Sequence, residues 1–228
     1  MNEYSREKTE LLDAALSLFS QTGYDKTSVG AIINQAGVSE ETFSRHFTSK
    51  EDLVEELVQH MSKQLMDKID AEVRDTTLSG LDKLNTFFSL AYGWKEANID
   101  VLLDMVRVLY REENHKLVHK MKRANMAMIT PLLTDIIAQG KEEGVFDTYQ
   151  PEEAAELIWH IRDAYADLNA QALLEAREDH EVMALMKRRV ELFIDACERI
   201  LGVPKGSIAR PEEAVYEAIS SQLFEKAA

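Results

Sequence analysis

The sequence predicts an all-α protein with a small N-terminal head of three short helices on a larger helical body. Apolar residues recur three and four positions apart along most of the chain, as at Leu12, Ala15 and Phe19. Strand-like alternation is almost absent, and the 9 Gly and 4 Pro are too few for a loop-rich fold. The predicted helices are short before Ser49 and long after it, which separates the head from the body.

Composition and charge narrow the class of protein. Hydrophobic residues make up 45% of the 228 residues and charged residues 29%, as in ordinary globular chains. The only cysteine is Cys197, which favours a reducing compartment, so we expect a cytoplasmic protein. No secretion signal is visible, and the apolar stretch at 126–133 is far short of the roughly 20 residues that a bilayer needs, so no membrane partner is expected. The net charge of -15 repels nucleic acid at long range, so DNA binding must depend on local residues.

Start and stop signals place about nine or ten helices. Ser49 with Asp52 fits a capping box, and Pro151 and Pro211 each precede two glutamates at a helix start. Pro131 should either kink or split the helix that contains it. The predicted spans are 4–21, 28–36, 39–46, 50–74, 79–96, 99–112, 115–141, 151–176, 180–201 and 211–225.

The segment 27–47 has the pattern of a helix-turn-helix. Gly37 can adopt the left-handed conformation that ends one helix, and Ser39 can cap the next. Phe43 and Phe47 give the second helix a buried face. The opposite face, which could enter a major groove, carries Glu40, Glu41, Thr42, Ser44, Arg45 and His46.

The stretch GYDKTSVGAIINQAGVSEETFSRHFTSKEDLV, residues 23–54, resembles the TetR family of transcriptional regulators. The resemblance implies a homodimer, a DNA-binding head, and a body that binds a small molecule and thereby alters DNA affinity. By resemblance, Thr42, Ser44, Arg45 and His46 match the recognition helix, and Thr27 and Lys50 match phosphate-holding positions. The full set of DNA-binding candidates is Thr27, Ser28, Ser39, Glu40, Glu41, Thr42, Ser44, Arg45, His46 and Lys50.

Two features of the head depart from the family pattern. Ser44 stands where the family usually has a tyrosine, and Glu41 stands where glycine or proline is common. Residues 1–50 contain five Lys or Arg against seven Asp or Glu, so the head lacks the basic character typical of DNA-binding domains. We therefore expect DNA binding that is either weak or very sequence-selective.

Aromatic and methionine residues are concentrated between Phe87 and Tyr165 in the body. They could line an effector pocket, since such sites are apolar with a few polar anchors, or they could be plain core. Both interpretations fit the spacing. The ligand-binding candidates are Phe87, Phe88, Tyr92, Met105, Tyr110, Met126, Trp159 and Asp163.

Two patterns of acidic or histidine residues have spacings that could place metal ligands on one helix face. Glu156, His160, Asp163 and Asp167 share one helix face, and His115 and His119 are four residues apart. Helix spacing supplies at most two or three of the ligands that a metal needs, and a solvated face explains the same residues. We assign no metal and no cofactor.

The last two long helices carry the apolar residues that the family uses for a dimeric four-helix bundle, although internal packing explains them equally well. No phosphate loop, nucleophile elbow or zinc-protease motif is present, so an enzyme is not expected. The predicted domains are a DNA-binding head at 1–49, a ligand-binding and dimerisation body at 50–203, and a C-terminal helix or tail at 204–228.

The sequence thus predicts a ligand-responsive DNA-binding regulator, with repression favoured over activation. It would bind a pseudo-palindromic operator as a dimer and be released by a small-molecule effector. The alternative is a helical small-molecule-binding or scaffolding protein whose head is impaired in DNA binding.

Overall fold

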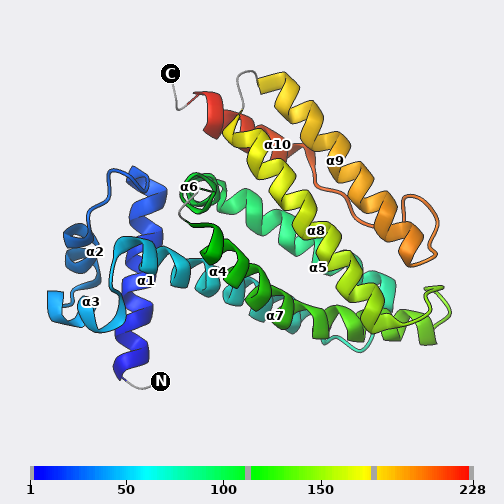
Figure 1. Cartoon of the computed structure of the whole chain (residues 1–228). Helices are drawn as coiled ribbons and strands as arrows, with labels where there is room; N and C mark the ends of the chain where they lie inside the picture. The colour runs from blue at the N-terminus through cyan, green and yellow to red at the C-terminus, as the bar shows by residue number, and fades with distance from the viewer. Residues whose placement is uncertain (1–2, 111–113, 176–178, 226–228) are drawn as a thin grey trace. The chain divides into compact units, whose positions relative to one another are not determined.

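A computed structural model describes residues 3–110, 114–175 and 179–225, and the described residues form helices with no strand. This confirms the predicted all-α class. Figure 1 shows the helices in chain order. They are α1 (Glu3–Thr22), α2 (Val29–Ala36), α3 (Glu40–His46), α4 (Lys50–Val73), α5 (Gly80–Ala97), α6 (Ile99–Leu109), α7 (His115–Glu142), α8 (Pro151–Leu174), α9 (Asp179–Ile200) and α10 (Glu213–Ser220), followed by a π-helical turn at Ser221–Glu225.

Local capping signals place most of these boundaries. The Ser49 hydroxyl accepts a hydrogen bond from the backbone N–H of Asp52 at 3.1 Å, as expected for the start of α4. Pro151 occupies the first turn of α8, where its missing N–H costs no hydrogen bond. Pro131 does not split its helix, because α7 continues through it. Two predicted helix ends, at residues 112 and 176, lie outside the described residues. The same holds for residues 1–2 of the first predicted domain and residues 226–228 of the last.

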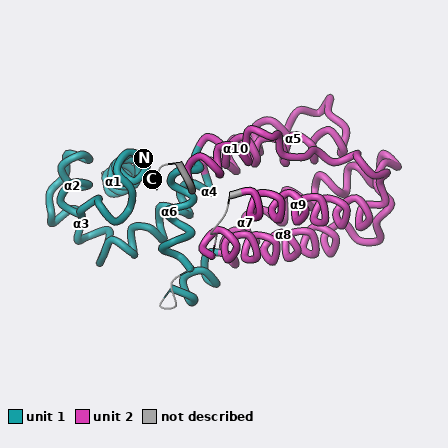
Figure 2. Tube along the Cα trace, turned by 90° about the horizontal axis from the view of Figure 1, so that it is seen from above, with its two compact units in different colours: residues 1–63, 98–121 teal, residues 64–97, 122–228 magenta. Residues whose placement is uncertain are grey.

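The chain divides into two compact units, which Figure 2 distinguishes by colour. Unit 1 consists of Met1–Lys63 and Asn98–Met121, and unit 2 of Gln64–Ala97 and Lys122–Ala228. Helix α6 thus belongs with the three N-terminal helices, and it packs against α1. The domain boundaries at 49 and 203 stay a prediction.

The core of unit 1 is formed by apolar side chains from α1, α2, α3 and the first part of α4. Phe19, Ile32, Phe47 and Leu53 are at most 2% exposed. Burying each of these side chains contributes about 1.5–3 kcal/mol. This core holds α2 and α3 at fixed angles to α1, which positions the candidate site described below.

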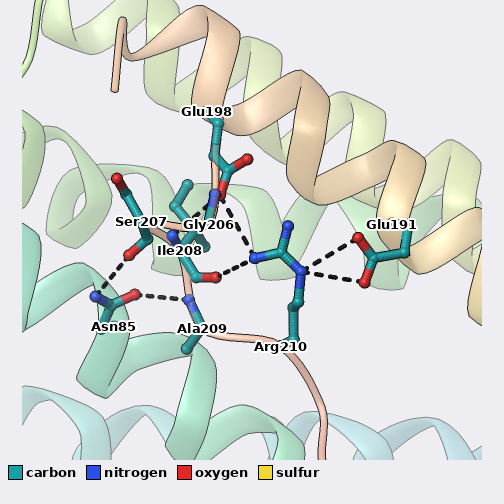
Figure 3. Close-up of polar contacts among 8 residues, drawn as sticks. All are labelled: Asn85, Glu191, Glu198, Gly206, Ser207, Ile208, Ala209 and Arg210. Atoms are coloured by element: carbon teal, nitrogen blue, oxygen red, sulfur yellow. Dashed lines mark hydrogen bonds and ion pairs between the residues drawn. The ribbon is translucent and has the colours of Figure 1, made fainter. Parts of the chain in front are cut away.

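In unit 2, α8 and α9 lie side by side, and α10 packs against α5 and α9. The segment after Gly202 is therefore a docked part of the unit. Figure 3 shows one reason. The buried Glu198 carboxylate accepts backbone N–H bonds from Gly206 at 2.8 Å and from Ile208 at 3.2 Å, and it lies 3.5 Å from the Arg210 guanidinium. These bonds hold the chain that leads into α10.

Candidate functional site

The turn between α2 and α3 has the geometry that the sequence predicts. Gly37 has φ of 68°, in the left-handed region that favours glycine, and its N–H donates to the Asn34 carbonyl at 3.3 Å. The Val38 N–H donates to the Ile33 carbonyl at 3.3 Å, which satisfies a second carbonyl at the helix end. The Ser39 hydroxyl then accepts the Thr42 N–H at 3.0 Å and caps α3.

Helix α3 is fixed by the aromatic pair on its inner face. Phe43 and Phe47 are 5% and 1% exposed, and their ring centroids are 5.5 Å apart. The side chains left exposed at this helix and at the start of α2 are all polar or charged. Among the predicted DNA-binding residues these are Ser28, Ser39, Glu40, Glu41, Ser44 and Arg45. These exposed side chains are polar or charged, and they can approach a nucleic-acid groove without displacing core residues.

Two residues that the sequence placed on the outer face of α3 are buried instead. Thr42 is 6% exposed, and its hydroxyl lies 3.0 Å from the Ser39 hydroxyl. The His46 side chain has no exposed surface, and its ring packs 4.1 Å from the ring of Tyr4 in α1. The outer-face placement was wrong for both, because α1 and the capping hydroxyl were not part of the helical-spacing argument. Their role in DNA contact stays a prediction.

The exposed Arg45 guanidinium is held by contacts inside the head. It donates to the Thr42 hydroxyl at 3.1 Å and lies 3.6 Å from the Glu7 carboxylate of α1. The same carboxylate is 3.5 Å from the His46 ring. Glu7 therefore competes for the cation that the sequence singles out for DNA, which spacing along α3 alone could not reveal.

Thr27 and Lys50, the predicted phosphate-holding residues, are engaged with the loop before α2. Thr27 is 4% exposed, and its hydroxyl donates to the Gly23 carbonyl at 2.8 Å. The Lys50 ammonium donates to the Tyr24 carbonyl at 2.5 Å and lies 3.8 Å from the centroid of the Tyr24 ring. In this arrangement both residues stabilise the loop that leads into α2.

A link from α6 to this loop was not predicted from the sequence. The Tyr24 N–H donates to Asp104 of α6 at 2.8 Å, and Arg107 pairs with the same carboxylate at 2.9 Å. The Tyr24 hydroxyl donates to Glu51 at 3.0 Å. The Glu51 carboxylate accepts hydrogen bonds from its own backbone N–H and from the Tyr24 hydroxyl. These two bonds, in that order of importance, lower the pKa of Glu51. The loop is thus held by α4 and α6 together.

Unit 2 contains a cluster of aromatic rings that includes several predicted ligand-binding residues. The rings of Phe87 and Phe88 meet edge to face at 5.6 Å, and Phe88 stacks on Tyr92 at 6.1 Å. Phe193 of α9 lies 6.0 Å from Phe88 and 5.5 Å from Tyr165 of α8. Phe87, Phe88, Tyr92 and Phe193 are buried, which is compatible with plain core, and their role in an effector pocket stays a prediction.

The other predicted ligand-binding residues do not join this cluster. Met105 and Tyr110 belong to unit 1. Met126 lines an open groove of about 590 Å³ between α7 and α8, together with Arg123, Thr130 and Glu156. Asp163 pairs with Arg162 at 3.0 Å.

Two polar groups at the edge of the aromatic cluster were not predicted as site residues. Lys95 and Arg162 lie near Tyr92 and Trp159, respectively: the Lys95 ammonium is 5.8 Å from the Tyr92 ring, and the Arg162 guanidinium is 4.7 Å from the Trp159 ring. Burial, with a smaller contribution from the Arg162 charge, lowers the pKa of Lys95 to about 7. Burial and the nearby charge of Arg162 in α8 distinguish Lys95 from a surface lysine.

Among the described residues, no group of three or more His, Cys, Asp or Glu side chains could hold a metal ion. Two of the acids considered for such a site have cationic partners: Asp163 pairs with Arg162 at 3.0 Å, and Asp167 pairs with Lys122 at 2.5 Å. Within the same residues, every helix is too short or too polar to cross a membrane. Burial raises the pKa of the Cys197 thiol to about 12, so it is a poor nucleophile.

A helix-turn-helix with a polar outer face is typical of DNA-binding transcriptional regulators. Residues 11–57 match the family described as "Bacterial regulatory proteins, tetR family", and residues 104–187 match "Tetracyclin repressor-like, C-terminal domain". The chain belongs to the TetR family.

Curated relatives and solved structures agree with this assignment. The repressor KstR2 of Rhodococcus jostii is 33% identical over 111 residues, which are 49% of this chain and 52% of that protein, so the match spans about half the length of that relative. KstR2 of Mycobacterium tuberculosis is 26% identical over 165 residues, covering 71% and 78% of the two chains. The structure of FadR from Bacillus subtilis in complex with stearoyl-CoA has a TM-score of 0.56 at 20% identity, covering 82% and 97%.

Proposed function

We propose that the protein is a repressor that binds operator DNA through the exposed face of α3 and is released by a small-molecule effector. The observation that carries the proposal is the capped helix-turn-helix, whose outer face presents Ser44 and Arg45 while Phe43 and Phe47 hold it in place. Its relatives are transcriptional regulators, and we infer regulation without catalysis for this chain. Action at an operator would place the protein in the cytoplasm.

We further propose that the repressor acts as a homodimer through α8 and α9. Four large apolar side chains on these helices are exposed: Leu157 at 50%, Leu168 at 48%, Leu174 at 43% and Leu192 at 70%. Burial of such residues against a second copy would remove apolar surface from water, and a two-fold dimer matches an operator with two half-sites. Sedimentation of the native chain and of Leu192→Glu tests this: the substitution should shift the protein to monomer, and an unchanged dimer would reject this face.

The effector is proposed to be largely apolar. The aromatic cluster of unit 2 provides apolar surface that could open for such a molecule, and the related FadR of Bacillus subtilis was solved with stearoyl-CoA. Stearoyl-CoA and free coenzyme A are therefore the first two probes. Release of a bound operator by stearoyl-CoA alone would support an acyl effector, and equal release by coenzyme A would contradict an apolar one.

The experiment that tests DNA binding is a selection of random duplexes on the purified protein, followed by fluorescence anisotropy on the best duplex at several salt concentrations. Selection of a pseudo-palindromic duplex, for which the affinity of the protein falls as salt rises, supports a dimer that binds a specific DNA sequence. No enrichment over random DNA would reject the proposal.

The second candidate is a helical small-molecule-binding protein with an impaired DNA-binding head. It is favoured by one observation, the capture of Arg45 by Glu7 on a face that also exposes Glu40 and Glu41. Binding of stearoyl-CoA by a protein that enriches no DNA would support this candidate.

A further inference from the structure

Unit 2 contains a group of hydrogen-bond donors on the end of α5 and the middle of α8, linked by the electrostatic effect of Arg162 on Lys95. Lys95 and Tyr92 come from α5, and Trp159 and Arg162 come from α8. Arg162 connects the two sides, because its guanidinium stacks 4.7 Å from the Trp159 ring and its charge also acts on Lys95. The Lys95 ammonium lies 5.8 Å from the Tyr92 ring.

An acceptor is missing from this group. The indole N–H of Trp159 and the hydroxyl of Tyr92 are buried without a hydrogen-bond partner among the described residues. Arg162 has one carboxylate, that of Asp163 at 3.0 Å, which balances one of the two positive charges. Lys95 has no carboxylate partner within the described part of the chain. Ammonium and indole N–H groups can only donate, so the group lacks a hydrogen-bond acceptor, and the unbalanced positive charge favours an anionic one.

Other lysines of the same unit show what a neutralised site looks like here. Lys187 also lies over a tyrosine ring, 5.1 Å from the centroid of Tyr216, but it pairs with the carboxylate of Glu213. Lys122 pairs with Asp167. Lys95 lies near the Tyr92 ring but has no carboxylate partner among the described residues. An unpaired, largely buried charge destabilises a fold, so its presence needs a compensating role.

We propose that Lys95, Trp159 and Arg162 bind the anionic group of an otherwise apolar effector, a carboxylate or a phosphate ester. The inference rests on the proposed function, because it assigns a chemical class to the effector of that repressor. Lys95 and Arg162 both keep part of their surface accessible, so an anion can reach them. The rings of Tyr92 and Trp159 offer apolar surface beside the charge for the adjoining hydrocarbon.

The test is a direct binding titration of the full chain in the absence of DNA. The fluorescence of Trp94 and Trp159 is the signal that reports binding. The probes are dodecanoate, dodecyl phosphate and dodecanol, which share one hydrocarbon tail and differ in the head group. The anionic probes are expected to bind at least about tenfold more tightly than dodecanol, which is the gain typical of one charge-assisted hydrogen bond. The tighter of the two anions identifies the head group.

Variants locate the site. Lys95→Met should reduce the affinity for both anions to that for dodecanol, and Lys95→Arg should retain the preference. Lys187→Met is the matched control, because it removes a lysine that stacks on tyrosine but is already neutralised, and it should leave anion binding unchanged. Far-UV circular dichroism confirms that each variant is folded.

Equal binding of dodecanol and the anions would overturn the proposal, as would an unchanged anion preference in Lys95→Met or no binding of any probe. Because no DNA is present, these results leave operator binding untouched. A protein that binds the anions through Lys95 but enriches no duplex would instead contradict the repressor while retaining the anion site.

Discussion

Arg45 in unit 1 and Lys95 in unit 2 both carry a positive charge at a candidate site, but their surroundings differ. The Arg45 guanidinium is exposed and already paired with Glu7 at 3.6 Å. Lys95 is mostly surrounded by protein and has no acid partner among the described residues. DNA must therefore compete with an internal carboxylate for Arg45, whereas an anionic effector would meet Lys95 unopposed. Four variants test this difference, from the largest expected effect to the smallest.

The first variant removes the support beneath the DNA-binding face. Phe47→Ala should reduce the free energy of unfolding by about 3–5 kcal/mol, because Phe47 is 1% exposed and its loss leaves a cavity under α3. Chemical denaturation measures the change. Tyr149→Ala is the control, since Tyr149 is 85% exposed and its truncation should change stability by less than about 0.5 kcal/mol. Equal effects would show that α3 is not held by this aromatic pair.

The second variant removes the exposed cation itself. Arg45→Ala should weaken binding to a selected operator by about 1–3 kcal/mol, through loss of a base or phosphate contact. Anisotropy on the selected duplex measures this change. Arg74→Ala, which removes an exposed arginine paired with Asp70 in α4, should leave operator affinity unchanged. If both variants bind as tightly as the native chain, α3 does not read DNA through Arg45.

The third variant removes the unopposed charge of unit 2. The folded pKa of Lys95 is about 7, below its usual value of 10.5, so the native chain gains stability as pH rises from about 7 to 10.5. Lys95→Met lacks this gain. At pH 6 the variant should be more stable by about 1 kcal/mol, or about 2–4 °C in Tm, and its advantage should shrink at pH 9.

Thermal melts at the two pH values check this prediction. Lys26→Met, which changes an exposed lysine, should melt like the native chain at both. A Lys95→Met variant less stable than the native chain at pH 6 would indicate that the ammonium has an acid partner.

The fourth variant frees Arg45 for DNA. Glu7→Gln should raise operator affinity by about 0.2–1 kcal/mol, the range for one exposed ion pair. Glu10→Gln removes the same charge from the same helix but from a pair with Arg6, so it controls for the overall charge of the head. Should both variants gain equally, net charge rather than the contact with Arg45 limits DNA binding.

Local signals explain why much of the fold could be predicted from the sequence. The caps at Ser39 and Ser49, the left-handed Gly37 and the proline at the start of α8 each depend on residues within a few positions of one another. Such patterns fix helix ends and the turn of the candidate DNA-binding site without knowledge of the tertiary structure.

Contacts between distant helices could not be predicted in the same way. Helical spacing placed His46 outside α3, but Tyr4 and Glu7 of α1 cover its ring. The bond from Tyr24 to Asp104 joins residues 80 positions apart. Lys95 reads as an ordinary surface lysine until α8 brings Arg162 near it. No motif in the sequence encodes these pairings.

The measurement that tests the central claim most directly is the release of operator DNA, monitored by fluorescence anisotropy. The native chain and Lys95→Met are compared side by side. The claim is that an anion at Lys95 lowers the affinity of the head for DNA, which requires the effector to prefer the released conformation. The account predicts that both proteins bind the selected operator equally and that the anionic dodecyl probes release only the native chain. Equal release of the two proteins would contradict the account.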